Sequence, residues 1–251
     1  MFHRLLSSPK RRILQLAGLL LTATMLRPAF ALGIDKLSLD IDANGKFSSS
    51  SQVVLFNDTN DVVFVTGRPL AWSSDDAGSL TTSPTTELVI SPAMARIPAQ
   101  GSATFSIRYI GPKKETEATF RAAFRETRMP GLEGGGDTGG VGAQVLAGIV
   151  VTIPVFVSDY AAKIPAFKDV EASFRRNGQE AMLTVNNGGG RHVIVDSVRI
   201  GDQEVRRPHD TLFAKRQKTY TGIKAPAPGD KLTLVLTNGT DTQRIDAAEA
   251  K

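Results

Sequence analysis

Two histidines offer the clearest candidates for acid–base chemistry in this sequence. His192 and His209 are the only histidines beyond the N-terminal leader, and the chain contains no cysteine. Either histidine could pair with Asp196 or Asp210, but a hydrolase also needs an activated nucleophile, and no Gly-x-Ser-x-Gly turn is present. Two isolated histidines also lack the close ligand spacing of a zinc site. We therefore expect ordinary surface or strand-end histidines, no metal and no enzymatic activity.

A glycine-rich loop, "GGGDTGGVGAQ" at 134–144, raises the possibility of phosphate binding. A P-loop needs a Gly-Lys-Ser/Thr ending, and this loop contains no lysine. A dinucleotide fingerprint needs a helix after its glycines, whereas β-branched residues follow here and disfavour a helix. We expect no nucleotide and no other cofactor.

The N-terminus has the features of a secretory signal. A basic region with Lys10, Arg11 and Arg12 precedes the apolar run Ile13–Met25 and the small-x-small pattern Ala29-Phe30-Ala31. This order predicts a signal peptide at 1–31, cleaved after Ala31. No other stretch is long and apolar enough for a transmembrane helix, so we expect no stable membrane insertion.

Removal of this leader changes the charge balance. The full chain has 30 Lys and Arg against 25 Asp and Glu, and five of the basic residues and none of the acidic ones lie before the cut. The mature chain therefore carries 25 of each and no net charge. Overall basicity gives no argument for nucleic-acid binding.

Short alternating or apolar runs separated by turn-forming residues dominate the mature chain. In "SATFSIRYI", the residues Ala103, Phe105, Ile107 and Tyr109 share one face, which is the pattern of a half-buried strand. Such spacing predicts an all-β fold with two β-sandwich domains, at 32–158 and 162–251. The expected strands are 36–41, 51–56, 62–65, 86–90, 103–109, 118–124, 145–157, 170–174, 181–185, 192–200, 218–223 and 231–236.

The run from Val145 to Val157 contains no charge and is rich in Val, Ile and Phe. An exposed segment of this kind is an aggregation hazard. Its residues at 152–157 fit an ordinary core strand. Its first part fits less well, because the glycine-rich loop before it is too flexible to cover it.

Residues 87–130, "ELVISPAMARIPAQGSATFSIRYIGPKKETEATFRAAFRETRMP", resemble the periplasmic chaperones of the chaperone–usher pilus pathway, the PapD-like superfamily. Upstream, "LSLDI" at 37–41 and "LAW" at 70–72 resemble the first strands of that family, and "PVFV" at 154–157 resembles the end of its seventh strand. "LTVNNGGGRHVIV" in the second half is similar to two strands of its second domain.

The resemblance implies two immunoglobulin-like domains set at an angle and a seventh strand that is lent to a pilus subunit lacking one strand. In this donor-strand complementation, alternating apolar side chains fill the open groove of the subunit. The odd-numbered residues of 145–157 are all apolar and share one face. The implied subunit-binding residues are Val145, Ala147, Ile149 and Val151.

The family anchors the C-terminal carboxylate of the subunit on two basic residues. The aligned positions, Ala43 and Pro154, are not basic. Lys36, Lys46 and Arg128 lie close in sequence to the expected strands and are candidates for the missing cleft anchor.

We therefore expect a non-enzymatic periplasmic chaperone that stabilises fimbrial subunits by donor-strand complementation and delivers them to an outer-membrane usher. The free protein could also cap its donor strand by dimerising. A structural alternative is a pilin-like or surface subunit, for which only "LGIDKLSLDI" at 32–41 could serve as a free donor extension. An exported hydrolase is the enzymatic alternative.

Overall fold

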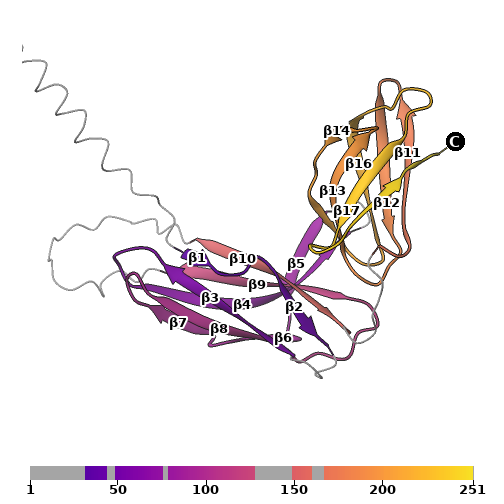
Figure 1. Ribbon diagram of the computed structural model, residues 1–251. Coiled ribbons are helices and arrows are strands. Elements are labelled where there is room, and N and C mark those ends of the chain that lie inside the picture. Colours follow the sequence, from indigo (N-terminus) through magenta and orange to yellow (C-terminus); the bar gives the residue numbers. More distant parts are fainter. Residues whose placement is uncertain (1–31, 44–48, 76–78, 128–148, 160–166, 251) are drawn as a thin grey trace, which may run out of the picture. The chain divides into compact units, whose positions relative to one another are not determined.

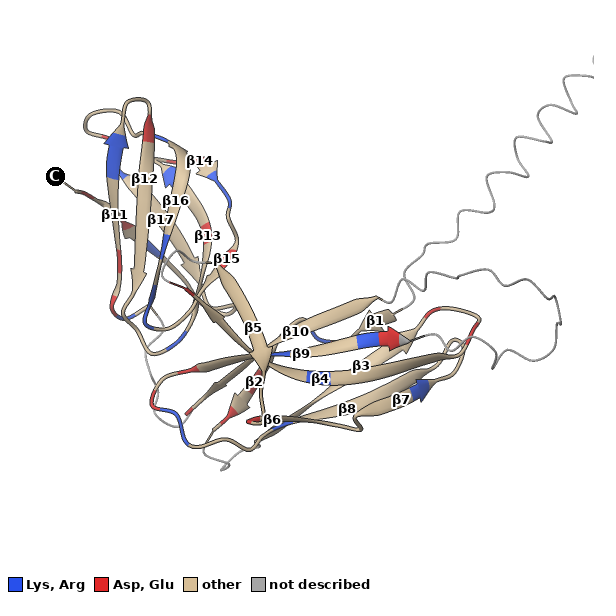
Figure 2. Cartoon of the chain, turned by 180° about the vertical axis from the view of Figure 1, so that it is seen from behind, with Lys and Arg blue, Asp and Glu red and all other residues tan. Residues whose placement is uncertain are grey.

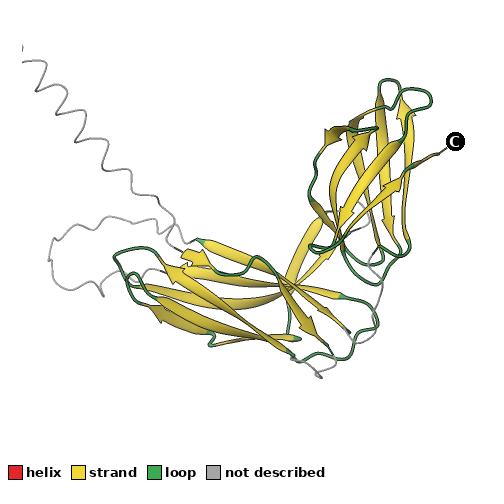
Figure 3. Ribbon diagram, viewed as in Figure 1, coloured by secondary structure: helices red, strands yellow, loops and turns green. Residues whose placement is uncertain are grey.

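Strands make up all the regular structure in the part of the chain that the structure describes. The computed structural model describes residues 32–43, 49–75, 79–127, 149–159 and 167–250. Every helix or strand within these ranges is a β-strand (Figure 3). The all-β prediction is therefore confirmed, whereas the predicted signal peptide lies outside the described residues.

The first half of the described chain forms a sandwich of two sheets (Figure 1). One sheet has the strand order β1-β3-β8-β6, and the other has the order β2-β10-β9-β4-β5, with β7 also paired to β4. The strands are β1 Leu32–Ile34, β2 Leu39–Asp42, β3 Ser50–Asn57, β4 Val63–Ser74, β5 Leu80–Pro84, β6 Leu88–Ser91, β7 Met94–Ile97, β8 Ser102–Tyr109, β9 Ala118–Thr127 and β10 Val150–Ser158.

Strand β8 shows why these sequences pair as they do. Phe105, Ile107 and Tyr109 are buried in the core, while Thr104 and Arg108 are exposed. Because successive side chains point to opposite faces, the alternation read from the sequence becomes one apolar and one polar face. Across the core, the ring of Phe105 meets that of Phe124 on β9 edge-on, with centroids 5.0 Å apart.

The strand expected at 36–41 is found only in its second part, as β2, and the sequence did not predict the separate strand β1 before it. Leu32–Ile34 pairs with β3, and Leu39–Asp42 pairs with β10. Between them, the Asp35 carboxylate accepts a hydrogen bond from the Val54 amide at 2.8 Å. The expected strand was therefore too long at its start, because the chain crosses from one sheet to the other at 35–38.

The second half forms another sandwich, with sheets of order β16-β12-β11-β19 and β14-β13-β17-β18, and with β15 also paired to β13. Its strands are β11 Val170–Asn177, β12 Glu180–Asn187, β13 Val193–Ile200, β14 Gln203–Arg206, β15 Asp210–Leu212, β16 Arg216–Lys224, β17 Leu232–Thr237, β18 Thr242–Asp246 and β19 Ala248–Glu249. A separate buried cluster that includes Leu183, Val195 and Leu234 forms its core. The chain thus has two sandwiches, whereas the exact domain boundaries remain a prediction.

A buried asparagine ends one strand in each sandwich, Asn57 on β3 and Asn187 on β12. Each side-chain amide donates to three backbone carbonyls, and each side-chain oxygen accepts the amide proton of the residue two positions later, Thr59 or Gly189, at 3.0 Å. A buried amide is tolerated only when it is hydrogen-bonded in this way. The two asparagines therefore hold together the loops at one end of each sandwich.

Candidate functional site

Strand β10 has one edge that is only partly paired. On one side it pairs with β9 along Val150–Val157. On the other side it pairs with β2 only at Val155–Ser158, in parallel. Among the described strands, none pairs with this second side at 150–154, so the first half of β10 presents an open edge.

The hydrogen-bonding pattern shows which backbone groups point to this open edge. The Glu126 amide donates to the Ile149 carbonyl at 2.9 Å, so the odd-numbered residues of β10 direct their backbone groups to β9. The Ser158 carbonyl accepts from Ala43 at 2.9 Å, which places the even-numbered groups on the β2 side. Val150 and Thr152 therefore offer both N–H and C=O to the open edge, whereas Pro154 has no N–H and its carbonyl lies where the pairing with Leu39 of β2 begins.

The side chains of β10 divide the strand into two parts. Ile153, Val155 and Val157 are buried in the core of their own sandwich. Further towards the N-terminus on the same face, Ile149 and Val151 are only half-buried. The apolar row therefore continues past the part of the strand that this core seals.

Of the four expected donor residues, two are described by the structure and two are not. Val145 and Ala147 lie outside the described residues, so their place remains a prediction. Ile149 and Val151 lie on one face of an open-edged strand, which is the arrangement that strand lending requires.

Of the three expected anchors, only Lys36 is described, because Lys46 and Arg128 lie outside the described residues. Lys36 is exposed, and its Nζ donates to the Gln52 carbonyl at 2.7 Å, between β1 and β2. This contact gives no support for an anchor beside β10.

A cation that the sequence reasoning missed lies beside β10. Arg121 on β9 is directly opposite Pro154 in the strand register. Its Nη1 donates to Thr152 Oγ1 at 2.9 Å, and its guanidinium carbon lies 4.1 Å from the centre of the Trp72 ring. Burial lowers the pKa of Arg121, and its Nε is buried without a hydrogen-bond partner.

Sequence reasoning missed Arg121 because the resemblance directed attention to β2 and β10, the strands that carry the anchors in the family. A signal was present in "EATFRAAFRE", where Phe120 and Phe124 alternate with Arg121 and Arg125. That alternation puts both arginines on the face opposite the core. The strand register was still needed to bring Arg121 next to β10.

The residue pair Glu117 and His192 joins the start of β9 to the start of β13. Glu117 Oε1 accepts from the His192 amide at 2.9 Å and lies 2.7 Å from His192 Nδ1. The Glu117 amide donates to the Gly190 carbonyl at 2.9 Å. The Glu117 side chain is only 2% exposed, so these contacts satisfy a carboxyl group that water scarcely reaches.

An aromatic cluster lies beside this pair. The Trp72 and Phe213 rings meet edge-on with centroids 4.6 Å apart, and Phe156 completes the buried group. The other neighbour of Phe156 is the His192 ring, which stacks on it at 3.7 Å. Phe156, on the even-numbered face of β10, therefore packs against residues of the second sandwich.

The histidines are separated from one another and have structural contacts. His209 Nδ1 lies 3.0 Å from Asp196, the pair considered from the sequence, and the His209 side chain is exposed. His192 instead contacts Glu117, 75 positions earlier in the chain, a partner that the sequence did not suggest. No group of three potential metal ligands is found among the described residues.

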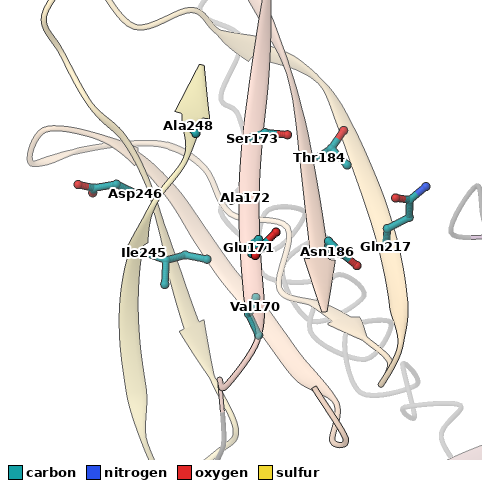
Figure 4. Close-up of a pocket in the computed structure, with 10 residues that line it drawn as sticks. All are labelled: Val170, Glu171, Ala172, Ser173, Thr184, Asn186, Gln217, Ile245, Asp246 and Ala248. Carbon is teal, nitrogen blue, oxygen red and sulfur yellow. The ribbon is translucent and has the colours of Figure 1, made fainter. Parts of the chain in front are cut away.

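A hollow of about 550 Å³ on the second sandwich is lined by both polar and apolar residues (Figure 4). Ser173, Thr184, Asn186 and Gln217 line it from β11, β12 and β16. Its Asp246 carboxylate accepts from Lys231 and Thr233, which lower the pKa of Asp246. The lining includes two carboxylates, Glu171 and Asp246, and no histidine.

No described helix has the length and apolar character that a transmembrane span requires.

This chain is similar to known proteins in structure. No family model matches the sequence, and no curated protein matches it. Among solved structures, a chain of the CsuC–CsuE chaperone–tip adhesion subunit pre-assembly complex, from archaic chaperone–usher Csu pili of Acinetobacter baumannii, matches with a TM-score of 0.65 and 17% identity. That match covers 88% of this chain and 100% of the other.

Two further chaperone structures match over similar lengths. The E. coli chaperone DraB matches with a TM-score of 0.59 and 18% identity, over 87% of this chain and 97% of that chain. A chain of the Salmonella enterica SafA pilin–SafB chaperone complex matches with a TM-score of 0.56 and 14% identity, over 88% and 98%. The chain therefore has the fold of the pilus chaperones, as the resemblance of residues 87–130 implied.

Proposed function

We propose that this protein is a periplasmic chaperone that holds pilus subunits by lending them strand β10 and its N-terminal extension. The observation that carries this proposal is the open edge at Val150 and Thr152, in the part of β10 where the apolar row extends beyond the core. Subunit capture of this kind is binding by strand addition and requires no catalysis.

The energy for binding comes from the backbone and from the apolar row. The open edge offers two N–H groups and two carbonyls, those of Val150 and Thr152. At about 0.5–1.5 kcal/mol for each hydrogen bond, four such groups contribute about 2–6 kcal/mol. Burial of each large side chain, such as Ile149, adds roughly 1.5–3 kcal/mol. Together these terms can offset the conformational entropy that polypeptide segments lose on binding.

We assign the role of carboxylate anchor to Arg121 rather than to Lys36, Lys46 or Arg128. Arg121 lies opposite Pro154, the position at which the family resemblance places an anchor. Its guanidinium is held by Trp72 and Thr152, and no described acid forms an ion pair with it. A guanidinium can bind a terminal carboxylate through two parallel hydrogen bonds.

The pairing of the N-terminal strands counts against the pilin-like alternative. A subunit of that class would carry a free donor extension, for which only residues 32–41 were available. Leu32–Ile34 and Leu39–Asp42 are instead both paired within the sandwich, to β3 and β10. Delivery to an outer-membrane usher, export through the leader and self-capping by dimerisation follow from the resemblance and remain part of the proposal.

Ile149→Asp tests the proposal because it places a charge on the lent face. The residue is only half-buried in the free protein, so we expect the variant to fold. The tagged chain is recovered from the periplasm of its own bacterium, and co-purified pilus subunits are identified by mass spectrometry. We expect subunits with the wild-type chain and none with Ile149→Asp. Equal recovery with both chains would refute the donor role of the strand.

Met182→Asp is the matched control for this experiment. Met182 is an exposed apolar residue on β12 of the second sandwich, so the variant introduces the same charge on a strand face that the proposal does not involve. We expect it to leave the recovery of subunits unchanged.

A further inference from the structure

The outward face of the sheet that contains β10 carries a group of arginines. The strand registers place Val150, Arg125 and Thr66 side by side across β10, β9 and β4. The next rows are Thr152, Ala123 and Arg68, and then Pro154, Arg121 and Leu70. On β7, Arg96 lies opposite Phe64 on the same face. We call Arg68, Arg96, Arg121 and Arg125 the arginine face.

No acid lies on the outward face of the strands that carry these arginines, and the described acids of that face, Asp40 and Asp42, lie on the edge strand β2. None of the residues that the registers place on this face at 64–72, 94–96, 119–127 and 150–156 is an Asp or a Glu. None of the four arginines forms an ion pair with an acid in the described part of the chain. Figure 2 shows the blue segments along β4, β7 and β9.

This clustering has a cost in the free protein. Arg68 lies opposite Ala123, which places Arg121 and Arg125 at its two diagonal positions on β9. Diagonal neighbours in a sheet lie roughly 7–8 Å apart, within reach of long side chains, and like charges there repel. The predicted mature chain has equal numbers of acids and bases, so this local excess is a property of the face. A bound anionic partner would relieve the repulsion.

The same face exposes apolar side chains. Val150 is 47% exposed beside Arg125, and Met94 on β7 is 54% exposed beside Thr66. Arginine with Met and aliphatic residues is the composition of protein–protein interfaces. The partner that fits is therefore an acidic polypeptide with some apolar residues.

A second copy of this chain does not fit as the partner face to face. A symmetric dimer would place the same patch of each copy against the other, and so arginine against arginine. Two rows of the arginine face instead continue directly into the open edge of β10, at Val150 and Thr152. A polypeptide bound at that edge therefore lies next to the arginines.

We propose that the arginine face binds an acidic segment of the pilus subunit that is held at β10, and that it selects clients by their charge. The naming of a pilus subunit as the partner rests on the proposed function, whereas the preference for an acidic strand rests on the face alone.

The test measures binding of two fluorescently labelled peptides to the mature chain by anisotropy. One peptide alternates Glu with Thr, and the other alternates Gln with Thr. We expect the wild-type chain to prefer the Glu peptide, and this preference to weaken as salt is added. In Arg68→Gln/Arg125→Gln, we expect affinity for the Glu peptide to fall by about two- to thirtyfold, the range for two exposed ion pairs.

Arg175→Gln/Arg244→Gln is the matched control, because both arginines are exposed on strands of the second sandwich. It removes the same charge and should leave the affinity unchanged. Equal binding of the two peptides, no binding of the Glu peptide, or equal losses in both double variants would overturn the arginine-face proposal. The Ile149→Asp experiment leaves all four arginines in place, so strand lending and charge selection can fail separately.

Discussion

A proline at position 150 tests the open edge of β10 without a change in charge. Val150 begins β10, and its N–H points away from β9 towards the open side. Proline has no N–H, and it is tolerated at the first residue of a strand and on sheet edges. The nearby Pro154 already occupies the same side of this strand. Val150→Pro should therefore remove one donor from the edge and keep the ladder to β9.

The structure gives different magnitudes for stability and for binding. Val150 is 47% exposed and loses no internal hydrogen bond, so we expect unfolding free energy to change by no more than about 0.5 kcal/mol. In the complex, one subunit carbonyl would be left without its donor, at a cost of about 1–3 kcal/mol. The dissociation constant should rise by about 5- to 150-fold, at tenfold per 1.4 kcal/mol.

Val151→Pro is the matched control one residue further on. The Val151 N–H points to Phe124 on β9, so this variant should lose about 1–3 kcal/mol of stability because a buried carbonyl loses its donor. Urea unfolding followed by circular dichroism measures stability, and surface-immobilised subunit recovered with the wild-type chain measures affinity. If Val150→Pro destabilises the free protein as much as Val151→Pro, or binds the subunit with unchanged affinity, the assignment of the open edge is wrong.

Two further predictions concern buried polar groups. Glu117→Ala should destabilise the protein by about 1–3 kcal/mol in urea unfolding, because it leaves the partly buried His192 amide without its acceptor. Glu115→Ala, at an exposed position, should have little effect, and equal values for the two variants would contradict the role given to this contact. Burial, followed by the neighbouring Glu87 carboxylate, raises the pKa of Tyr109 above its ordinary value of 10.0. The contribution of the Tyr109 hydroxyl to folding stability is therefore complete below pH 10.0 and is lost as the pH rises through the folded-state pKa. The stability of the wild type relative to Tyr109→Phe should therefore shrink in alkaline urea titrations, and a constant difference from pH 8 to pH 11 would count against this reasoning.

The sequence could predict what depends on local alternation. The faces of "SATFSIRYI" and the apolar row of β10 follow from a period of two, and the structure places Phe105, Ile107 and Ile153 in the core accordingly. Only residues 39–41 of the strand expected at 36–41 are in a strand, because alternation does not show where a chain changes sheet. Asp35 and its contact with Val54 mark that crossing.

The rest required the pairing of distant strands. Glu117 meets His192 across 75 positions, and Trp72 meets Phe213 across 141, distances over which no local pattern operates. The arginine face was hidden for the same reason, because Arg68 and Arg125 become neighbours only through the register of β4 with β9. Sequence shows which residues share a face of one strand, whereas register decides which faces join.

Hydrogen exchange at the amides of Val150 and Thr152 tests the central claim most directly. Both amides point to the open side of β10, while the amides of Val151 and Ile153 point to β9. In the free protein we predict rapid exchange at 150 and 152 and slow exchange at 151 and 153, followed by protection of all four once a pilus subunit is bound. Slow exchange at 150 and 152 in the free monomer, or no added protection in the complex, would contradict the account.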